Sequence, residues 1–334
     1  MDIVIPINEK KLMARDKQLY FGDKKRYSSM TSVVFVSPNR FVCASYVMCE
    51  MYLVEFDMVK NEYKILFTLS TTGDPQRRTV VNTDLIDYNS ELQMLVVSNY
   101  RHKSMTFYKY HDRDARIVYY KTVQNLQQGS CHGICWIDND MVGFGTCGRG
   151  NDQSGVYLYD LLQNGIIASY QELQNNYLHE PSNLWLCKDI AINPIENLST
   201  NQTVKTIYAI YCEGAPHPTD RLTYDSKVVM YHLVSTQSMC KIIKIKEQIL
   251  PRCHCDCVRY VMPNSLYITV QLSQNEQQND NATNELGKVL VLDGETLELK
   301  KEYNDYEFPH GVDVRYGMMA VTEYSKSNIK IVRI

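Results

Sequence analysis

Short apolar runs separated by polar turn residues recur along the whole chain, and almost no segment shows the spacing of an amphipathic helix. The run Val33–Val36, for example, is followed by the turn residues Ser37–Asn39 and then by the run Arg40–Cys43. Runs of this length, rich in Val, Ile, Tyr and Phe and bounded by turn residues, are typical of β-strands. The pattern therefore predicts an all-β protein.

A repeated hairpin distinguishes a propeller from a sandwich or a barrel. In three segments an apolar strand ends in two small or polar residues and a tyrosine, and a second apolar strand follows after four residues. The first strands of these hairpins are Phe41–Tyr46, Leu95–Tyr100 and Met319–Tyr324. A motif that repeats in a fixed register predicts structurally equivalent units.

Another strand precedes each hairpin, and a fourth strand follows most of them. In four units the first strand opens with a related tetrad: Cys131–Ile134, Cys187–Ile190, Cys253–Asp256 and Pro309–Val312. Six units emerge in this way, starting near residues 31, 83, 132, 188, 254 and 310. Four strands per unit at this spacing are typical of propeller blades. We therefore expect residues 1–334 to form a single β-propeller domain of about six four-stranded blades.

The sixth unit lacks a fourth strand, because only three strands precede Ile334. An unpaired strand edge invites association with other chains. Residues 1–30 are therefore expected to supply a latch strand that closes the ring, followed by a lead-in to the first blade. Asp2–Ile5 is the expected latch, and Leu19–Phe21 is the alternative.

Polar insertions lengthen the fourth and fifth units. Residues 213–225 and 273–286 are expected to be insertions within hairpins, and residues 193–204 are expected to be a further loop between two strands of the fourth unit. Polar low-complexity segments of this kind are usually loops. Loops between the second and third strands lie on the same face as the starts of the inner strands, where propellers usually carry their sites.

The pattern resembles the lactonase-like and NHL-like propeller superfamily. The segments that carry the resemblance are His132–Ile134, His310–Asp313, Ser98–Tyr100 and Thr322–Tyr324. The resemblance covers nearly the whole chain and implies a fold rather than a reaction, since propellers include hydrolases, lyases, sugar binders and scaffolds. Lactonase-type relatives imply a calcium set of Glu, Asn and Asp, but the equivalent strand starts here carry His, Lys and Thr. Calcium-dependent lactone hydrolysis is therefore not expected.

Composition narrows the range of partners. The net charge is −3 and the isoelectric point is about 6.3, so neither a nucleic acid nor an anionic membrane is an expected partner. The N-terminus lacks the basic start and apolar core of a signal peptide, and no apolar run approaches the roughly 20 residues that span a bilayer. The odd count of eleven cysteines indicates reduced thiols rather than a disulfide framework. We therefore expect a cytoplasmic protein.

The candidate chemistry lies at the residues that open the innermost strands, because these strands line the central channel and begin at one mouth of it. By alignment of the units, these residues are Thr31, Thr83, His132, Lys188, His254 and His310. Imidazole is the commonest metal ligand and the natural general base near neutral pH. Three histidines with open coordination positions are a known catalytic metal arrangement.

His132, His254 and His310 are therefore candidate ligands of a divalent transition-metal ion, and together with Lys188 they are candidate catalytic residues. Lys188 would bind a carboxylate or a phosphate, or would act as a base if desolvated. The alternative role is structural. A histidine at this position can hydrogen-bond backbone carbonyls of a neighbouring blade and hold the blades in register.

Other polar residues of the inner and second strands are expected to contact a ligand at the same mouth. They are Thr83, Asn99, Tyr100, Arg101, Glu323 and Tyr324. Tyrosine combines an apolar ring with a polar hydroxyl, which suits contacts with sugars or peptides. The alternative is that these tyrosines only cap their blades.

Two functions remain open on the sequence alone. The first is a site for a polar or sugar-derived small molecule, on which the protein would act as a metal-assisted hydrolase or lyase. The second is a protein-interaction scaffold without chemistry, which would use loops 213–225 and 273–286 and the rim that carries the tyrosines. The partner is a small molecule in the first case and another protein in the second.

Overall fold

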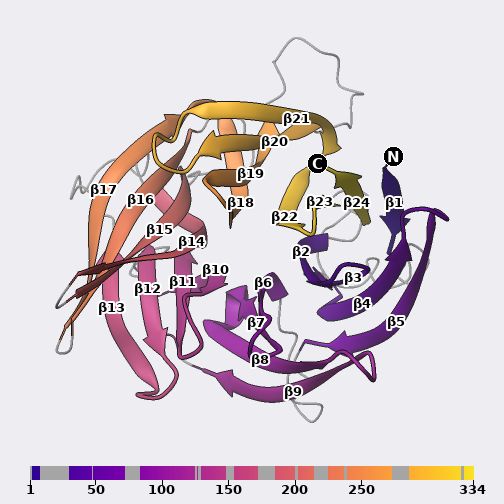
Figure 1. Ribbon diagram of the computed structural model, residues 1–334, viewed down its shortest axis with the longest axis horizontal. Helices are drawn as coiled ribbons and strands as arrows, with labels where there is room; N and C mark the ends of the chain where they lie inside the picture. The colour runs from indigo at the N-terminus through magenta and orange to yellow at the C-terminus, as the bar shows by residue number, and fades with distance from the viewer. Residues whose placement is uncertain are drawn as a thin grey trace.

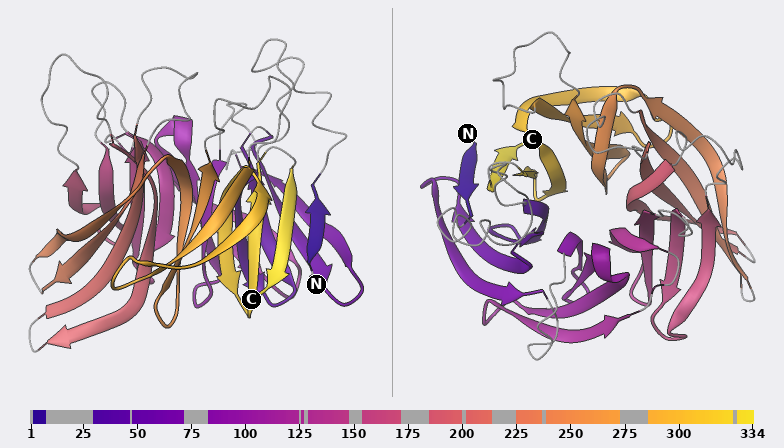
Figure 2. Two further views of the ribbon diagram at one scale, coloured as in Figure 1. Left: turned by 90° about the horizontal axis from the view of Figure 1, so that it is seen from above. Right: turned by 180° about the vertical axis from the view of Figure 1, so that it is seen from behind.

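The chain forms six four-stranded antiparallel sheets arranged as a ring around a central axis (Figure 1). The computed structural model describes residues 2–7, 30–46, 48–71, 83–124, 126, 129–147, 154–171, 185–199, 202–213, 225–236, 239–272, 286–324 and 327–334. Views from above and from behind show the sheets standing side by side around the axis, as in a propeller (Figure 2). The predicted six-bladed β-propeller is therefore confirmed.

The first three blades follow one another in chain order, and each begins with the strand nearest the axis. Blade 1 comprises β2 (Met30–Ser37), β3 (Arg40–Ser45), β4 (Glu50–Asp57) and β5 (Glu62–Ser70). Blade 2 comprises β6 (Thr83–Asn89), β7 (Met94–Asn99), the 3-10 turn η1 (Tyr100–His102), β8 (Ser104–His111) and β9 (Arg116–Val123). Blade 3 comprises β10 (Ser130–Trp136), β11 (Met141–Cys147), β12 (Gly155–Asp160) and β13 (Gly165–Gln171).

The next two blades repeat this order, and the last blade uses both ends of the chain. Blade 4 comprises β14 (Trp185–Ser199), β15 (Gln202–Glu213), β16 (Ser226–Ser235) and β17 (Cys240–Leu250). Blade 5 comprises β18 (Cys253–Val261), β19 (Ser265–Leu272), β20 (Leu286–Asp293) and β21 (Leu299–Glu307). Blade 6 comprises β22 (Pro309–Arg315), β23 (Met318–Glu323), β24 (Asn328–Arg333) and β1 (Ile3–Pro6).

The core lies between the blades, which explains why the strands read as nearly continuous apolar runs. On β7, Leu95 and Val97 pack against blade 1, whereas Val96 between them packs against blade 3. Successive side chains of a strand point to opposite faces of the sheet, and here both faces are covered. No helix within the described ranges is long and apolar enough to cross a lipid bilayer.

The N-terminal strand closes the ring. β1 pairs antiparallel with β24, with Ile3 opposite Ile331 and Ile5 opposite Ile329. The expected latch Asp2–Ile5 is thus the strand that completes blade 6, and the two ends of the chain lie side by side (Figure 1). The alternative latch, Leu19–Phe21, lies outside the described residues.

Truncation of Ile5 is expected to destabilise the closed ring. Ile5 is 0% exposed and packs in the core between blades 6 and 1, whereas its neighbour Val4 is 49% exposed. The variant Ile5→Ala should lower the free energy of unfolding by about 2–5 kcal/mol, and Val4→Ala should change it by less than about 0.5 kcal/mol. Urea denaturation followed by circular dichroism measures both values. Equal effects of the two variants would show that β1 does not hold the ring closed.

The structure corrects the expected loop at residues 193–204. Within this segment, residues 193–199 of β14 and 202–204 of β15 are strand residues, with Asn197 opposite Val204 and Ser199 opposite Gln202. Paired strands satisfy their backbone groups within the ladder, so a polar composition here does not indicate a loop. Of the two expected insertions, residues 214–224 and 273–285 lie outside the described residues.

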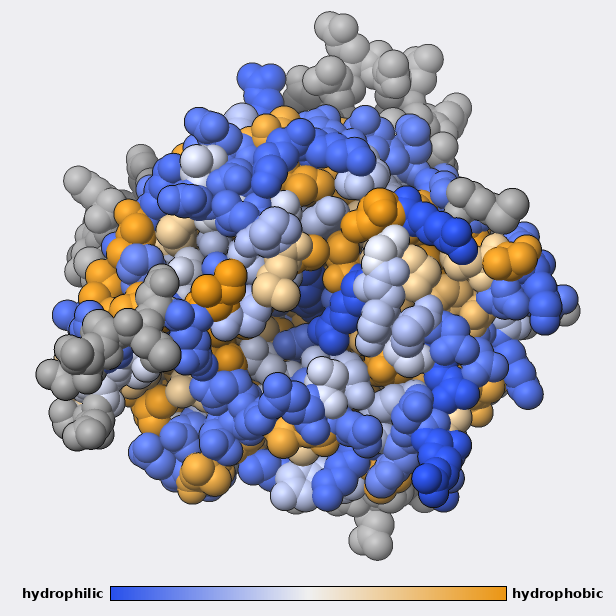
Figure 3. Space-filling model, in the orientation of Figure 1, coloured by the Kyte–Doolittle hydropathy of each residue, from blue (hydrophilic) through white to orange (hydrophobic). Residues whose placement is uncertain are grey.

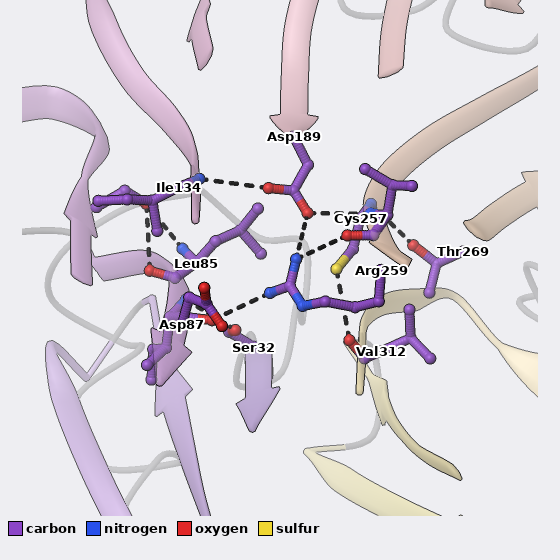
Figure 4. Close-up of polar contacts among 12 residues, drawn as sticks. Ser32, Leu85, Asp87, Ile134, Asp189, Cys257, Arg259, Thr269 and Val312 are labelled. Atoms are coloured by element: carbon purple, nitrogen blue, oxygen red, sulfur yellow. Dashed lines mark hydrogen bonds and ion pairs between the residues drawn. The ribbon is translucent and has the colours of Figure 1, made fainter. Parts of the chain in front are cut away.

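Hydrophilic residues gather around a hollow at the centre of the ring (Figure 3). A buried carboxylate links several of the blades. Asp189, on β14, is fully buried and accepts hydrogen bonds from the backbone N–H groups of Ile134 (3.3 Å) and Val258 (3.0 Å). It also accepts one from Nη1 of Arg259 at 2.8 Å, and Nη2 of Arg259 donates to the carbonyl of Ile86 at 3.0 Å (Figure 4). The network connects the inner strands of blades 2 to 5.

Candidate functional site

Bulges near the starts of the inner strands direct side chains toward the axis. In β10 the regular pairing is interrupted between Cys131 and Ile134, and in β22 it is interrupted between Pro309 and Val312. A bulge leaves residues out of the ladder and re-aims their side chains. Each of the six inner strands has such an interruption near its start. The first residue left out of the ladder is, in blade order, Thr31, Asp84, His132, Lys188, Asp256 and His310.

The observed register places Asp84 and Asp256, rather than Thr83 and His254, at the positions equivalent to His132. Thr83 still pairs with Asn99 in the ladder, so the bulge of β6 starts one residue later than the sequence alignment assumed. His254 likewise pairs with Gln271, and the bulge of β18 starts two residues later. An alignment of the strand starts cannot detect such offsets, because bulge positions follow from backbone pairing.

Hydroxyl groups on the second strands fix the bulges in place. Ser98 Oγ accepts a hydrogen bond from the backbone N–H of Leu85 in its own blade (2.9 Å) and donates to the carbonyl of His132 in the next blade (2.6 Å). Thr269 in blade 5 donates in the same way to the carbonyl of His310 at 2.7 Å. These buried hydroxyls position the backbone of both histidines and account for the small polar residues in the repeated hairpin.

Three of the bulged residues converge on one point. Nε2 of His132 lies 3.1 Å from Oδ2 of Asp84, and Nε2 of His310 lies 4.0 Å from Oδ1 of the same carboxylate. The candidate ligand atoms of Asp84, His132 and His310 all lie within 4.8 Å of one another, and all three residues are buried. Two imidazoles and one carboxylate with open positions form a ligand set that divalent transition metals use. We call these three residues the metal trio.

One imidazole of the metal trio, that of His310, is held in an orientation suited to metal binding. Nδ1 of His310 donates a hydrogen bond to the carbonyl of Thr31 at 2.9 Å, which leaves Nε2 as the acceptor that faces the trio. The rings of His132 and His310 stack with centroids 6.2 Å apart. Burial is the first cause that lowers the pKa of both imidazoles, and for His132 the positive charge of Lys188 is the second. Both rings are therefore uncharged near neutral pH.

Lys188 places a positive charge beside the metal trio. Its Nζ lies 3.4 Å from Nε2 of His132 and 3.5 Å from Oδ1 of Asp256. Burial acts to raise the pKa of Asp256, but the charges of His254 and Lys188 help to outweigh burial, and the pKa lies well below its ordinary value. Asp256 is therefore ionised, and its Oδ1 lies close both to this ammonium group and to Nε2 of His310, which is 3.8 Å away.

The structure separates His254 from the metal trio. Nε2 of His254 lies 3.1 Å from Oδ1 of Asp256, and its side chain is 25% exposed. Within the described ranges, the one group of three candidate ligand atoms that lie within 4.8 Å contains Asp84 and not His254. The carboxylate of Asp84 thus occupies the place that the sequence prediction gave to a third imidazole.

The predicted rim residues divide into two groups. The ring of Tyr100 packs edge-on against His132, and the ring of Tyr324 stacks on His310, each with centroids 5.4 Å apart. The side chains of Asn99 and Glu323 instead form hydrogen bonds with neighbouring strands. Nδ2 of Asn99 donates to hydroxyls of the next strand at 3.1 and 2.9 Å, and Oε1 of Glu323 accepts from a backbone N–H at 3.1 Å.

The remaining two residues that were predicted to contact a ligand are Thr83, which precedes Asp84, and Arg101, which follows Tyr100. Thr83 is fully buried, and within the described ranges neither its hydroxyl nor Oδ1 of its ladder partner Asn99 has a hydrogen-bond partner. Buried polar atoms of this kind are rare in native proteins unless a water, an ion or a ligand satisfies them. Arg101 lies in η1, and its side chain is outside the described residues.

Comparisons with known proteins support the assignment of a β-propeller fold but identify no family. No family model and no curated protein matches the chain. A solved protein from Lactobacillus plantarum is 13% identical, with a TM-score of 0.54 over 96% of this chain and 88% of that chain. Kuenenia stuttgartiensis hydrazine synthase is 9% identical (TM-score 0.51; 95% and 99% covered). The β-propeller domain of Myceliophteria thermophila Cps50 (Swd1) is also 9% identical (TM-score 0.50; 94% and 99% covered). Likeness at this identity shows the fold alone.

Proposed function

We propose that this propeller binds a divalent transition-metal ion at one mouth of its channel and acts on a polar or sugar-derived small molecule as a metal-assisted hydrolase or lyase. The convergence of Asp84, His132 and His310 within 4.8 Å carries the proposal. A metal ion bound by this trio would supply Lewis-acid polarisation of a ligand oxygen. The resemblance to lactonase-like propellers supports a small-molecule site at this mouth.

The residues around the metal trio suit an anionic or hydroxyl-rich ligand. The ammonium group of Lys188 would anchor a carboxylate or phosphate, and the ionised carboxylate of Asp256 would accept a hydrogen bond from a bound hydroxyl. The rings of Tyr100 and Tyr324 pack against the two imidazoles and would provide apolar contact for a sugar face. We place the protein in the cytoplasm as part of this proposal, since all eleven cysteines are thiols and thiols persist in reducing compartments.

Metal titration of the purified chain tests the proposal. After chelator treatment, calorimetric titration with Zn²⁺ or Mn²⁺ is expected to give about one equivalent bound, as a preformed site requires. Replacing the exposed His111 by alanine is the matched control and should leave the stoichiometry unchanged. The alternative function, a protein-interaction scaffold that uses residues 213–225 and 273–286, predicts no stoichiometric binding of either metal.

Removal of the Lys188 charge is expected to tighten metal binding. Nζ of Lys188 lies 3.4 Å from a ligand atom of His132, so it repels a divalent ion bound there. At an effective dielectric constant near 20 this repulsion exceeds about 1.4 kcal/mol, so Lys188→Met should lower the Kd for zinc by at least about ten-fold. Competition with a chromogenic chelator measures the change, and the exposed Lys60→Met is the charge-matched control. An unchanged or weaker affinity in Lys188→Met would place the metal elsewhere.

A further inference from the structure

The outer strand of blade 4 has a long edge that faces away from the channel. β17 pairs with β16 along one side, and within the described ranges no strand pairs with its other side. It comprises eleven residues, Cys240–Leu250, whereas the outer strands of the other blades comprise between four and nine. β17 lies on the outside of the ring (Figure 1). Backbone N–H and C=O groups along such an edge can pair with another chain. We call Cys240–Leu250 the blade-4 edge.

Isoleucine side chains are exposed along the blade-4 edge. Ile243 is 39% exposed, Ile245 is 48% exposed and Ile249 is 40% exposed. Short strands and prolines commonly protect an edge from pairing, but β17 is neither short nor interrupted by proline. Isoleucine also favours the extended backbone of a strand. The edge therefore offers both backbone groups and apolar surface to an additional strand.

The exposed isoleucines lie on both faces of blade 4. Ile242 packs toward blade 3, so its neighbour Ile243 faces blade 5. Val228 packs toward blade 5 and lies opposite Gln248, so the next residue, Ile249, faces blade 3. Side chains of an added strand would alternate between the same two faces, so the strand would find apolar contacts on each.

The charges of the blade-4 edge are mainly positive. Lys241, Lys244 and Lys246 lie on this strand together with one carboxylate, that of Glu247. Oε2 of Glu247 is 2.8 Å from Nζ of Lys244 and 3.3 Å from Nζ of Lys227, so two ammonium groups already share it. Nζ of Lys246 donates to a backbone carbonyl of blade 5, and within the described ranges no carboxylate pairs with Lys241 or Lys246. The excess positive charge would repel a second basic edge and attract an acidic one.

The outer strand of blade 2 provides a comparison. On β9, Val118 is 41% exposed, which is close to the value for Ile243. Nζ of Lys109 there lies 5.0 Å from the ring centroid of Tyr120, so a ring of the same blade already covers this cation. β9 also has only eight residues. It is therefore a suitable control for the blade-4 edge.

We propose that the blade-4 edge binds an extended segment of a partner protein in which apolar residues alternate with Asp or Glu. The segment would join blade 4 as a fifth strand, with its carboxylates beside Lys241 and Lys246 and its apolar side chains beside the exposed isoleucines. In strand addition of this kind, backbone hydrogen bonds provide affinity and alternate side chains provide specificity. The edge belongs to an outer strand, whereas the metal trio lies on inner strands, so this inference is independent of the proposed metal site.

Peptide binding tests the charge and backbone requirements. The probes are fluorescein-labelled peptides in which valine alternates with glutamate or with lysine, and fluorescence anisotropy measures their Kd for the purified chain. The glutamate peptide is expected to bind at least about ten-fold more tightly than the lysine peptide. Replacing its central valine by proline should weaken binding at least about ten-fold, because proline cannot donate to the ladder. Equal binding of the three peptides would overturn the proposal.

Charge reversal locates the bound peptide. In Lys241→Glu/Lys246→Glu the preference is expected to invert, so that the lysine peptide binds more tightly than the glutamate peptide. Lys60→Glu/Lys64→Glu changes the net charge equally on exposed residues of blade 1 and should keep the native preference. Circular dichroism checks that both variants are folded. If both variants lost the glutamate peptide equally, net charge rather than the blade-4 edge would attract it, and the proposal would be wrong.

An uncharged substitution gives a second, independent measure. Ile243→Thr keeps a residue that favours strands but removes apolar surface, and it is expected to weaken binding of the glutamate peptide by about three-fold or more. Val118→Thr removes similar surface from β9 and should leave the Kd unchanged. Equal effects of the two variants would show that the peptide does not pair with β17.

A second copy of the chain is the alternative occupant of the edge. Size-exclusion chromatography with light scattering is expected to show a monomer, because two such edges would bring their lysines together. A dimer that Ile243→Thr dissociates, while Val118→Thr leaves it intact, would assign the edge to self-association and would overturn the inference of an acidic partner.

Discussion

The variant His132→Ala is expected to bind zinc at least about a hundred-fold more weakly than the native chain, because an outer-shell partner alone is typically worth 10–100-fold and His132 is a direct ligand in the site that we propose. Asp84→Asn and His310→Gln should have effects of the same size, since each removes or weakens one of the three converging ligand atoms. Chelator competition measures the affinity, and circular dichroism checks that each variant is folded.

The matched control for this series is His254→Gln. Its ring lies against Asp256 and outside the metal trio, so zinc affinity should stay within about three-fold of the native value. Comparison of Asp84→Asn with His254→Gln distinguishes the three ligands that converge in the structure from the three histidines predicted from sequence. If His254→Gln lost the metal and Asp84→Asn kept it, the three histidines predicted from sequence would be the ligands, and the Asp84-based site would be ruled out.

Truncation of Asp189 is expected to be among the most destabilising single changes in the described core. Asp189→Ala removes the acceptor of two backbone N–H groups and of the Arg259 guanidinium, which is itself buried. Breaking a buried ion pair by removing one partner typically costs about 3–5 kcal/mol, because it leaves an uncompensated buried charge. Chemical denaturation should therefore show a loss of that size in the free energy of unfolding.

A solvent-exposed ion pair provides the comparison for Asp189. Asp112 pairs with Arg40 at 3.2 Å, but its side chain is 57% exposed. Asp112→Ala should cost no more than about 1 kcal/mol, as is usual for exposed pairs. Similar losses in Asp189→Ala and Asp112→Ala would mean that the charge network at the axis contributes little beyond ordinary surface pairing.

The fold could be read from the sequence because each blade repeats the same local pattern. The inner strands begin at Met30, Thr83, Ser130, Trp185, Cys253 and Pro309, within three residues of the predicted starts. Alternate residues of a strand pack against different neighbouring blades, as on β7. The strands therefore appear in the sequence as short continuous apolar runs, which do not have the spacing of an amphipathic helix. The segment 193–204 was misassigned because a solvent-exposed hairpin carries the same polar composition as a loop.

The site was only partly predictable, since the bulges decide which side chains face the axis. His132, Lys188 and His310 fall where the sequence alignment put them, whereas Asp84 and Asp256 were missed. A usable signal was present. In every blade, the first bulged residue lies two positions before an apolar residue of the regularly paired strand. These apolar residues are Val33, Ile86, Ile134, Ile190, Val258 and Val312. An alignment on these residues would have found both carboxylates.

The sharing of blade 6 between the two ends of the chain has a consequence for biosynthesis. β1 leaves the ribosome before blades 1 to 5, and its partner β24 leaves after them. Domains generally fold as units while they are synthesised from the N-terminus, yet here five blades precede the partner of the first strand. Contacts this distant in sequence form slowly. β1 would thus stay without its partner while the five blades between them are synthesised, which is the period when chaperones are most needed.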